Sequence, residues 1–551
     1  LWVSNGTQAG TKLVKEIGAG TTQAYTYTGA AVGSTFFFRA YEGNGWELWK
    51  SDGTAAGTQL VKDINPGGGW SEPDDLVAVG SLLFFSAIDG SHGREMWVSD
   101  GTAAGTQLVA DLSPGSDTYF QSQAALGGNA ILSLYTSTDG YRIWKSDGTP
   151  GGTVKLGTAA YGDYLTPFGG AVYFTGYDGS GYRLWKTDGT EAGTVVVSNA
   201  AGGYPYPLGA SSSGLFFEGT DEATDDSGLW VTDGTAAGTK LLKGIFSSAG
   251  TAALDGGQLL LWSDSGSTGA ELWKTDGTSA GTGLVRSVFA GTDGSFPTGG
   301  VTIGNITYFS AYDATHGREL WRTDGTAAGT TLVKDVWTGL ASSSPTLLTA
   351  VGSTLFFQAR TGDGYELWKS NGTAAGTVLV KDIYAGSSSS TPQALTGVGS
   401  TLYFTATTPT GGRELWKSNG TGAGTVQVLD INAGASSSNP TGLTVLGSTL
   451  FFQAYAPASG YELWKSNGTA PGTALVADLN PGTGGAYPSN LSTLGSALYF
   501  QAYTPASGYE LWKSNGTAAG TTLVKDVRTG TDSSYPSNLK AVGSALFFQA
   551  Y

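Results

Sequence analysis

The chain has 551 residues, a formal net charge of -16 and no cysteine. Hydrophobic residues make up 40% of it and aromatic residues 12%, which is enough apolar material for a large core. The negative charge disfavours binding to nucleic acid or insertion at an anionic membrane, because both present phosphate groups. The absence of cysteine excludes disulfides, thiolate nucleophiles and cysteine-ligated metals. No apolar run reaches the length of about 18 residues that predicts a transmembrane helix.

A tryptophan preceded by leucine, methionine or isoleucine recurs along the whole chain. Neighbouring copies are 41 to 48 residues apart, a spacing typical of propeller blades or solenoid coils. The recurring residues are Trp2, Trp49, Trp97, Trp144, Trp185, Trp230, Trp273, Trp321, Trp368, Trp416, Trp464 and Trp512. The sequence therefore consists of twelve copies of one structural unit.

The unit at 414–461 shows the elements that each copy should form. The segment ELWKS at 414–418 predicts a strand, and the Asn-Gly of 419–420 supplies the positive φ that a hairpin turn needs. Residues 425–431 alternate and predict a second strand, and 432–440 are a Gly/Ser/Pro connection. Residues 442–446 and 449–455 predict two more strands around a Gly-Ser turn. No stretch keeps helical spacing over ten residues, so each unit should be four strands.

Tandem four-stranded antiparallel units predict an all-β β-propeller of twelve blades, a single domain over 1–551. The first segment, LWVSNGT, matches the third strand of a unit, and the last, GSALFFQAY, matches the second. We therefore expect the N- and C-terminal strands to pair and close the propeller. Two six-bladed propellers are the alternative. Units around 142–270 are shorter and less regular, and predict a divergent sector.

The motif residues themselves have a structural interpretation. Asp and Asn tolerate turn geometry and bond to nearby backbone amides, so either can hold the hairpin after the tryptophan. Because Asn replaces Asp in five copies, a required negative charge at this position is not expected. The tryptophans should pack between sheets, each burying about 150–250 Å². The turn residues are Asn5, Asp52, Asp100, Asp147, Asp188, Asp233, Asp276, Asp324, Asn371, Asn419, Asn467 and Asn515.

Candidate catalytic residues are few. His92 and His316 are the two histidines, and they occupy the same turn of different units, so no catalytic triad is predicted. Paired carboxylates could support glycoside hydrolysis, but the glutamates of the repeated ELW motif are equivalent to one another, whereas an active site needs singular residues. These glutamates include Glu366, Glu414, Glu462 and Glu510. We expect no catalytic residue and no enzyme.

Singular residues occur where the repeat breaks. The segment 220–228 gathers Asp221, Glu222, Asp225 and Asp226, a set of oxygen ligands that would suit calcium, although their spacing matches no EF-hand loop. A solvated acidic loop is the other interpretation. Calcium at this loop is the only cofactor that the sequence suggests.

Extra aromatic residues lie on the connections between units. Trp70 and Trp337 are candidates for stacking against carbohydrate, with local packing as the alternative. The segment YPYP at 204–207 and Trp262 are likewise found in one unit each.

The repeated motif resembles the bacterial ELWxxDGT-repeat family along essentially the whole chain. ELWKSDGT at 47–54 and ELWRTDGT at 319–326 match it at every position, whereas RLWKTDGT at 183–190 and GLWVTDGT at 228–235 depart at the first. ELWKSNGT at 366–373 and in three later copies replaces Asp with Asn. The resemblance implies a β-propeller-like bacterial repeat protein that is secreted or surface-exposed, and it implies no activity.

These observations predict a non-enzymatic extracellular scaffold or adhesion protein at the cell surface, with a protein or a carbohydrate as partner. A propeller that binds or cleaves carbohydrate, with its site in the divergent sector, is one alternative. A passive subunit of a larger surface assembly is the other.

Overall fold

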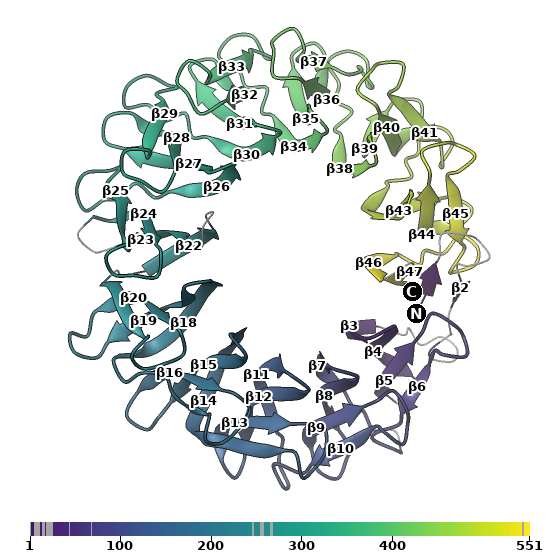
Figure 1. The fold of residues 1–551 in the computed structure, drawn as a ribbon. Coiled ribbons are helices and arrows are strands. Elements are labelled where there is room, and N and C mark those ends of the chain that lie inside the picture. Colours follow the sequence, from purple (N-terminus) through teal and green to yellow (C-terminus); the bar gives the residue numbers. More distant parts are fainter. Residues whose placement is uncertain are drawn as a thin grey trace. The chain divides into compact units, whose positions relative to one another are not determined.

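The computed structural model of the chain describes residues 2–4, 12–13, 17, 26–42, 45–67, 69–244, 247–253, 258–264, 268–542 and 545–550. Throughout these residues the regular structure is β-strand, arranged in antiparallel sheets (Figure 1). They contain no helix that could cross a membrane. The prediction of an all-β chain with many four-stranded antiparallel sheets is confirmed, but residues 119–244 form one sheet of eleven strands instead of separate sheets.

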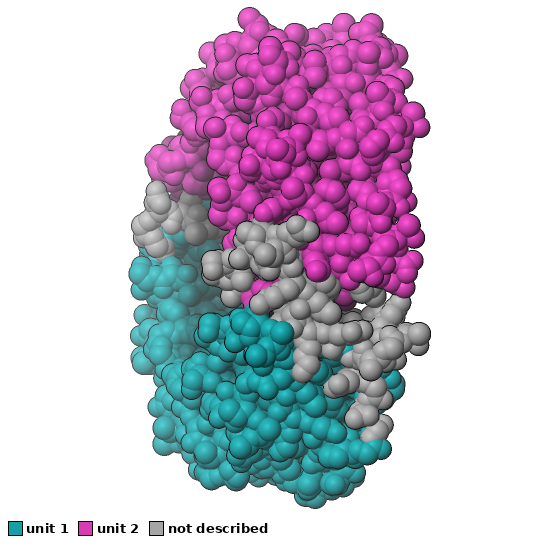
Figure 2. Space-filling model, turned by 90° about the vertical axis from the view of Figure 1, so that its right-hand side faces the viewer, with its two compact units in different colours: residues 1, 13–266, 274–283 teal, residues 2–12, 267–273, 284–551 magenta. Residues whose placement is uncertain are grey.

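The chain divides into two compact units, which Figure 2 shows in different colours. Unit 1 comprises residues 1, 13–266 and 274–283, and unit 2 comprises residues 2–12, 267–273 and 284–551.

Unit 1 contains two four-stranded sheets and one sheet of eleven strands. The eleven-stranded sheet stands where the repeat predicts several separate four-stranded sheets. The first sheet is β3 (Thr26–Val32), β4 (Thr35–Glu42), β5 (Gly45–Ser51) and β6 (Gln59–Lys62), and the second is β7 (Asp74–Val79), β8 (Leu82–Ile88), β9 (Arg94–Ser99) and β10 (Gln107–Ala110). The eleven-stranded sheet is β11 (Tyr119–Leu126), β12 (Asn129–Thr136), β13 (Gly140–Ser146), β14 (Val154–Phe168), β15 (Ala171–Tyr177), β16 (Tyr182–Thr187), β17 (Val195–Val196), β18 (Ala201–Ser211), β19 (Gly214–Asp221), β20 (Ser227–Thr232) and β21 (Lys240–Gly244).

A further four-stranded sheet has residues assigned to both units. Its strands are β22 (Ser247–Ala253), β23 (Leu259–Asp264), β24 (Ala270–Thr275) and β25 (Gly283–Arg286).

Unit 2 contains five sheets whose four strands follow one another in the chain, and a sixth that joins the two ends of the chain. The five are β26 (Thr298–Ile303), β27 (Ile306–Asp313), β28 (Gly317–Thr323) and β29 (Thr331–Lys334); β30 (Thr346–Val351), β31 (Thr354–Thr361), β32 (Gly364–Ser370) and β33 (Val378–Lys381); β34 (Gln393–Val398), β35 (Thr401–Thr408), β36 (Gly412–Ser418) and β37 (Val426–Gln427); β38 (Thr441–Leu446), β39 (Thr449–Ala456), β40 (Gly460–Ser466) and β41 (Ala474–Ala477); and β42 (Ser489–Leu494), β43 (Ala497–Thr504), β44 (Gly508–Ser514) and β45 (Thr522–Lys525).

The predicted pairing of the terminal strands is present in the sixth sheet. β1 (Trp2–Ser4) pairs antiparallel with β47 (Ala545–Gln549), and Trp2 faces Phe548 across the pair. β2 (Lys12–Leu13) and β46 (Ser537–Val542) complete the sheet in the order β2-β1-β47-β46. Strands from the two ends of the chain thus build one four-stranded unit.

The tryptophans of the repeat pack in the hydrophobic cores between sheets, as predicted. Within unit 2, for example, Trp368 of β32 packs with Leu320 and Val333 of the preceding sheet. The ten buried members are between 1% and 9% exposed: Trp49, Trp97, Trp144, Trp185, Trp230, Trp273, Trp321, Trp368, Trp416 and Trp464. Trp512 is half-buried, and the side chain of Trp2 lies outside the described residues.

The Asp and Asn residues of the motif make the same turn, which confirms their predicted structural role. Asp100 Oδ1 accepts hydrogen bonds from the N–H of Thr102 at 2.7 Å and from its hydroxyl at 2.8 Å. Asn371 Oδ1 accepts the same two bonds from Thr373, at 3.0 and 2.8 Å. These bonds lower the pKa of Asp100. Asn5 lies outside the described residues.

The glutamate of the motif holds the connection between sheets, a role that the sequence did not reveal. In the first sheet, the Glu47 carboxylate accepts hydrogen bonds from the N–H groups of Ile64 and Ser71 and from the Ser71 hydroxyl at 2.5 Å. These donors belong to the segment 63–73, which connects β6 to β7. Eight such glutamates are at most 1% exposed: Glu47, Glu95, Glu271, Glu319, Glu366, Glu414, Glu462 and Glu510. We call the eight sheets that carry them the regular sheets.

Burial makes these carboxyl groups unusually weak acids. It outweighs the hydrogen bonds they accept, and it raises the pKa of Glu47, Glu95, Glu319 and Glu510 to about 7. In the sheet of Glu462, Ala486 replaces the serine that donates its hydroxyl to the glutamate in other sheets, such as Ser71 to Glu47. Glu462 Oε2 is accordingly buried without a hydrogen-bond partner among the described residues. Its pKa is also raised to about 7.

The eleven-stranded sheet forms where this glutamate is missing. The motif position is occupied by Arg142, Arg183 and Gly228. Here the connection is itself a strand: β14 has 15 residues and pairs first with β13 and then with β15. Backbone N–H groups that a buried carboxylate would satisfy in a regular sheet are satisfied by strand pairing instead. The predicted divergent sector, 142–270, overlaps this sheet, which spans 119–244.

Candidate functional site

Nine tyrosines gather on the eleven-stranded sheet of unit 1. Each ring lies close to at least one other, with centroids between 4.8 Å (Tyr164 and Tyr206) and 6.2 Å (Tyr161 and Tyr204) apart. We call this set the tyrosine cluster: Tyr119, Tyr135, Tyr141, Tyr161, Tyr164, Tyr177, Tyr182, Tyr204 and Tyr206. It draws on β11 to β16 and on β18.

The cluster is accessible to a ligand. Tyr119 is 53% exposed and Tyr206 is 45% exposed, and Tyr164 and Tyr177 are exposed as well. Several contacts are edge-to-face, such as Tyr141 with Tyr161 at 70° and Tyr164 with Tyr206 at 83°. In an edge-to-face pair the rings do not stack on each other, so part of a ring face stays available for another contact.

A repeated backbone feature presents three of these rings. Tyr161, Tyr164 and Tyr204 have φ values of 65°, 55° and 69°, in the left-handed region that side chains other than glycine rarely adopt. The strand register shifts at the same place, between Asp163 and Thr166. Pairs of such residues, three apart, recur where the first strand of a sheet begins: Glu72 and Asp75, Ser344 and Leu347, Thr391 and Ala394, Tyr487 and Asn490, Tyr535 and Asn538. The left-handed backbone is therefore part of the architecture, and what varies is the side chain that it presents.

Asp163 is the acidic group at the centre of the cluster. Its Oδ2 accepts a hydrogen bond from the Tyr204 hydroxyl at 2.9 Å, and its Oδ1 accepts one from the N–H of Tyr164 at 2.9 Å. The Tyr204 hydroxyl also lies 3.2 Å from that of Tyr161. Burial, together with the hydrogen bonds that the Tyr204 hydroxyl makes with Tyr161 and Asp163, raises the pKa of Tyr204, so that its hydroxyl is neutral at physiological pH. The arrangement combines apolar faces, neutral hydroxyls and one carboxylate.

The four acidic residues proposed for calcium do not come together as a metal site. Glu222 pairs with Arg183, its Oε1 lying 2.8 Å from Nη1, and Asp221 Oδ1 accepts a hydrogen bond from the N–H of Ala223. Asp225 and Asp226 are exposed. In the described part of the chain no group of three or more such ligands could hold a metal ion. Calcium binding at this loop stays a prediction.

Trp70 lies in unit 1 and Trp337 in unit 2. Trp70 is 51% exposed and contacts Tyr41 edge-on, with centroids 6.4 Å apart. Trp337 is half-buried, and the Arg360 guanidinium lies 4.9 Å from its ring centroid. Stacking of either residue on a carbohydrate stays a prediction.

The two histidines are turn residues. His92 Nδ1 lies 2.6 Å from Asp89, and this hydrogen bond raises the pKa of His92. His316 Nδ1 contacts both Asp313 and the Thr315 hydroxyl, whereas a catalytic base uses one ring nitrogen for each partner.

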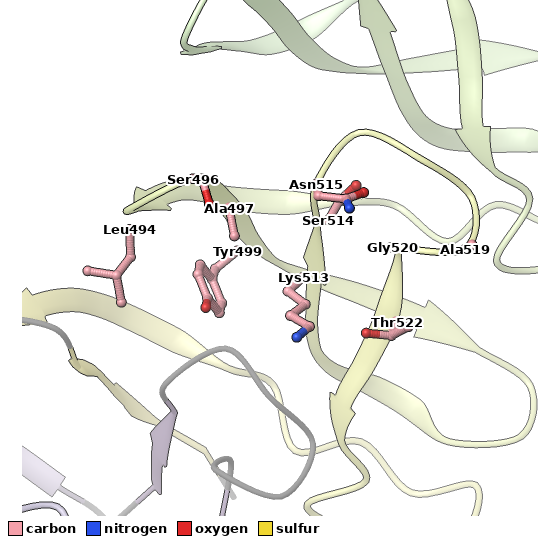
Figure 3. Close-up of a pocket in the computed structure, with 10 residues that line it drawn as sticks. All are labelled: Leu494, Ser496, Ala497, Tyr499, Lys513, Ser514, Asn515, Ala519, Gly520 and Thr522. Carbon is pink, nitrogen blue, oxygen red and sulfur yellow. The ribbon is translucent and has the colours of Figure 1, made fainter.

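The cavity at the last regular sheet is a packing position between sheets. It has a volume of about 360 Å³ and is lined by Tyr499, Lys513 and Asn515 among others (Figure 3). In the preceding sheet, Lys465 occupies the position of Lys513, and its Nζ donates to the carbonyl of Gly516 in the next sheet. A turn of the neighbouring sheet therefore occupies this place elsewhere in the chain, so the cavity is not our candidate site.

Comparisons with known proteins bear on the fold. No family model and no curated protein matches the chain. Solved structures do: puromycin hydrolase (15% identity, TM-score 0.25) covers 60% of this chain and is itself covered over 58%. The tricorn protease (11% identity, TM-score 0.26) covers 90% of this chain and is itself covered over 49%. A putative TolB from Agrobacterium tumefaciens (17% identity, TM-score 0.23) covers 41% of this chain and is itself covered over 83%. The chain thus spans less than two thirds of the two peptidases, and its structural neighbours are propeller-like.

These neighbours contradict two predictions. The non-enzymatic scaffold and the absence of enzymatic activity were inferred from the equivalence of the repeats, but the matched structures include puromycin hydrolase, a prolyl endopeptidase and the tricorn protease. Equivalence of the repeats therefore does not exclude an enzyme, and the inference from repetition was wrong. At these identities and TM-scores the likeness is one of fold and carries no activity to this chain. The ELWxxDGT resemblance, the extracellular location and the partners stay predictions.

Proposed function

We propose that unit 1 binds a polypeptide substrate across the tyrosine cluster. The single observation that carries this proposal is the continuous set of nine rings, four of them exposed, where the repeat departs from its regular form. Regular sheets contain smaller sets of three rings at the same positions, such as Tyr455, Tyr461 and Tyr487. The eleven-stranded sheet joins nine rings into one set.

Tyrosine is well suited to polypeptide recognition. Its ring offers a large apolar contact at a small cost in side-chain entropy, and its hydroxyl bonds to peptide groups, so tyrosine is enriched in protein-binding surfaces. Nucleic-acid bases also stack on aromatic rings, but a phosphate backbone would be repelled by a chain of net charge -16. The same charge favours a neutral or basic polypeptide.

The neighbouring structures include a puromycin-hydrolyzing peptidase and prolyl endopeptidases, at TM-scores of 0.29 and 0.26. A likeness of this size carries no activity to this chain. Hydrolysis is accordingly measured in the same experiment rather than assumed.

The experiment measures binding of fluorescent peptides of about 12 residues, of basic, neutral and acidic composition, by anisotropy. We expect binding to the wild type, and loss of about tenfold in affinity in the double variant Tyr164→Ala/Tyr206→Ala, since exposed aromatic anchors carry much of the energy of an interface. The matched control is Tyr487→Ala/Tyr535→Ala, which removes two exposed rings from regular positions of unit 2. Mass spectrometry of the same samples reports any cleavage.

Equal binding by both double variants would refute the tyrosine cluster as the site. Absence of binding to every peptide would refute the proposed function.

We also propose that the sheets form one propeller of twelve blades, closed by β1 and β47. The support is the pairing of these strands in one four-stranded sheet, together with the packing of successive sheets within each unit. Electron-microscopy projections of the purified chain should show a single annulus. Two smaller discs would instead favour two six-bladed propellers.

A further inference from the structure

The first sheet contains a cation held between an aromatic ring and a carboxylate. The Arg39 guanidinium lies 5.2 Å from the ring centroid of Trp46. Its Nη1 is 3.6 Å from Asp74 Oδ2, which belongs to the following sheet. The ring attracts the cation through its negative face, and the carboxylate neutralises its charge. This trio is an internal template for a cation site.

The tyrosine cluster repeats two members of the trio and lacks the third. Strand register shows which residues are equivalent. Phe38 faces Trp49 in the first sheet, and Leu132 faces Trp144 in the eleven-stranded sheet. The next residues along these strands, Arg39 and Ser133, are therefore equivalent. Tyr141, three residues before Trp144, takes the place of Trp46. Asp163 faces Thr175 as Asp74 faces Ser86, so Asp163 takes the place of Asp74. The ring and the carboxylate are kept, and the arginine is replaced by a serine.

The charge of Asp163 is left without a cation. Its partners are the Tyr204 hydroxyl and the N–H of Tyr164, and none of its described contacts is an ion pair. The neighbouring cations make other contacts: Lys155 pairs with Asp139, Arg183 pairs with Glu222, and Arg142 Nη1 donates to the carbonyl of Tyr141.

Ser133 is no substitute for the arginine. It is fully buried, and its Oγ has no hydrogen-bond partner among the described residues. A half-buried carboxylate beside tyrosine rings is stabilised by an incoming positive group.

We propose that Asp163, with the rings of Tyr141, Tyr161 and Tyr204, forms a subsite for an arginine side chain of the bound polypeptide. This inference rests on the proposed function and adds the residue that the cluster selects. Arginine fits better than lysine, because its planar guanidinium can face a ring and a carboxylate at once, as Arg39 does in the first sheet.

The test uses two peptides that differ only in one side chain, arginine or its neutral isostere citrulline. We expect the wild type to bind the arginine peptide at least tenfold more tightly. Asp163→Asn keeps an acceptor for the Tyr204 hydroxyl but removes the charge, and should reduce the preference to less than about threefold. Asp74→Asn is the matched control in a regular sheet and should leave the preference unchanged.

A second variant, Ser133→Arg, places an arginine at the position in the tyrosine cluster that is equivalent to Arg39. It should fill the subsite and abolish the preference for arginine over citrulline while the citrulline peptide still binds. Equal affinity of the wild type for the two peptides would overturn the arginine subsite and leave the proposed function standing. Failure to bind either peptide would count against the proposed function itself.

Discussion

The regular sheets and the eleven-stranded sheet solve the same problem in different ways. Each must satisfy the backbone of a segment that passes from one set of strands to the next. A regular sheet does so with a buried glutamate, as Glu319 does for Val336 and Ser343. The eleven-stranded sheet extends the segment into a strand that pairs on both sides. The connections that follow a buried motif glutamate are loops, whereas those that follow Arg142 and Arg183 run into long strands, β14 and β18, that carry tyrosines.

Removal of the glutamate from a regular sheet should have the largest effect. Glu366→Ala leaves the N–H groups of Ile383 and Ser390 and the Ser390 hydroxyl without their acceptor. We expect a loss of about 3 kcal/mol in local stability, since each buried group left unsatisfied costs about 1–3 kcal/mol. Hydrogen exchange of residues 383–391 measures it. Glu366→Gln, which keeps an acceptor oxygen, should cost much less, and equal costs for the two variants would contradict this role.

Introduction of the glutamate into the divergent sector should have the next largest effect. Arg183→Glu restores the motif residue, but it places a third carboxylate beside Asp178 and Glu222 in a buried position. We expect a destabilisation of about 1 kcal/mol in thermal or urea unfolding, because the ion pair between buried Arg183 and exposed Glu222 is broken and replaced by like-charge repulsion. Arg183→Gln is the control for simple loss of the pair. A stabilised Arg183→Glu variant would show that the two kinds of connection are interchangeable.

The two regions should also respond differently to pH. Burial raises the pKa of Glu47 to about 7 from its ordinary 4.5, so the folded state takes up a proton that the unfolded state has released. Its contribution to stability is complete below pH 4.5 and is lost as the pH rises through about 7. We expect at least tenfold greater hydrogen-exchange protection of residues 64–72 at pH 5.5 than at pH 8, after correction for intrinsic rates. Residues 154–163, which have no such glutamate, should change little, and a similar change in both segments would contradict the comparison.

The smallest effect should come from an exchange within the motif turn. Asn371→Asp and Asp100→Asn both keep the oxygen that accepts from the threonine two residues later. We expect each to change the free energy of unfolding by less than about 0.5 kcal/mol, the usual range for exposed sites. Thr373→Ala, which removes the hydroxyl shared by Asn371 and Gly376, is the destabilising control.

Local patterns were sufficient to predict much of the fold. Strands, hairpin turns and buried tryptophans follow from alternation, Asn-Gly signals and a fixed period, all of which act within a few residues. The role of Glu47 could not be read in this way, because its partners lie 17 and 24 residues further along the chain. The same holds for the length of β14, which depends on the absence of a distant acceptor.

The candidate site was only partly visible in the sequence. The unusual YPYP segment contains Tyr204 and Tyr206, and it marked the divergent sector. The other rings, such as Tyr119 and Tyr161, are spread over more than 40 residues and meet only through strand pairing. A count of tyrosines per unit would have been the one available signal. The acidic loop and the two tryptophans were more conspicuous in the sequence, but none of these residues belongs to the tyrosine cluster.

Photo-crosslinking tests the central claim most directly. An arginine-containing peptide that carries a benzophenone group is irradiated with the wild-type chain, and the modified residues are mapped by mass spectrometry. The account predicts that crosslinks competed by unlabelled peptide concentrate within residues 119–206. Competed crosslinks concentrated in the regular sheets would contradict the assignment of binding to the tyrosine cluster.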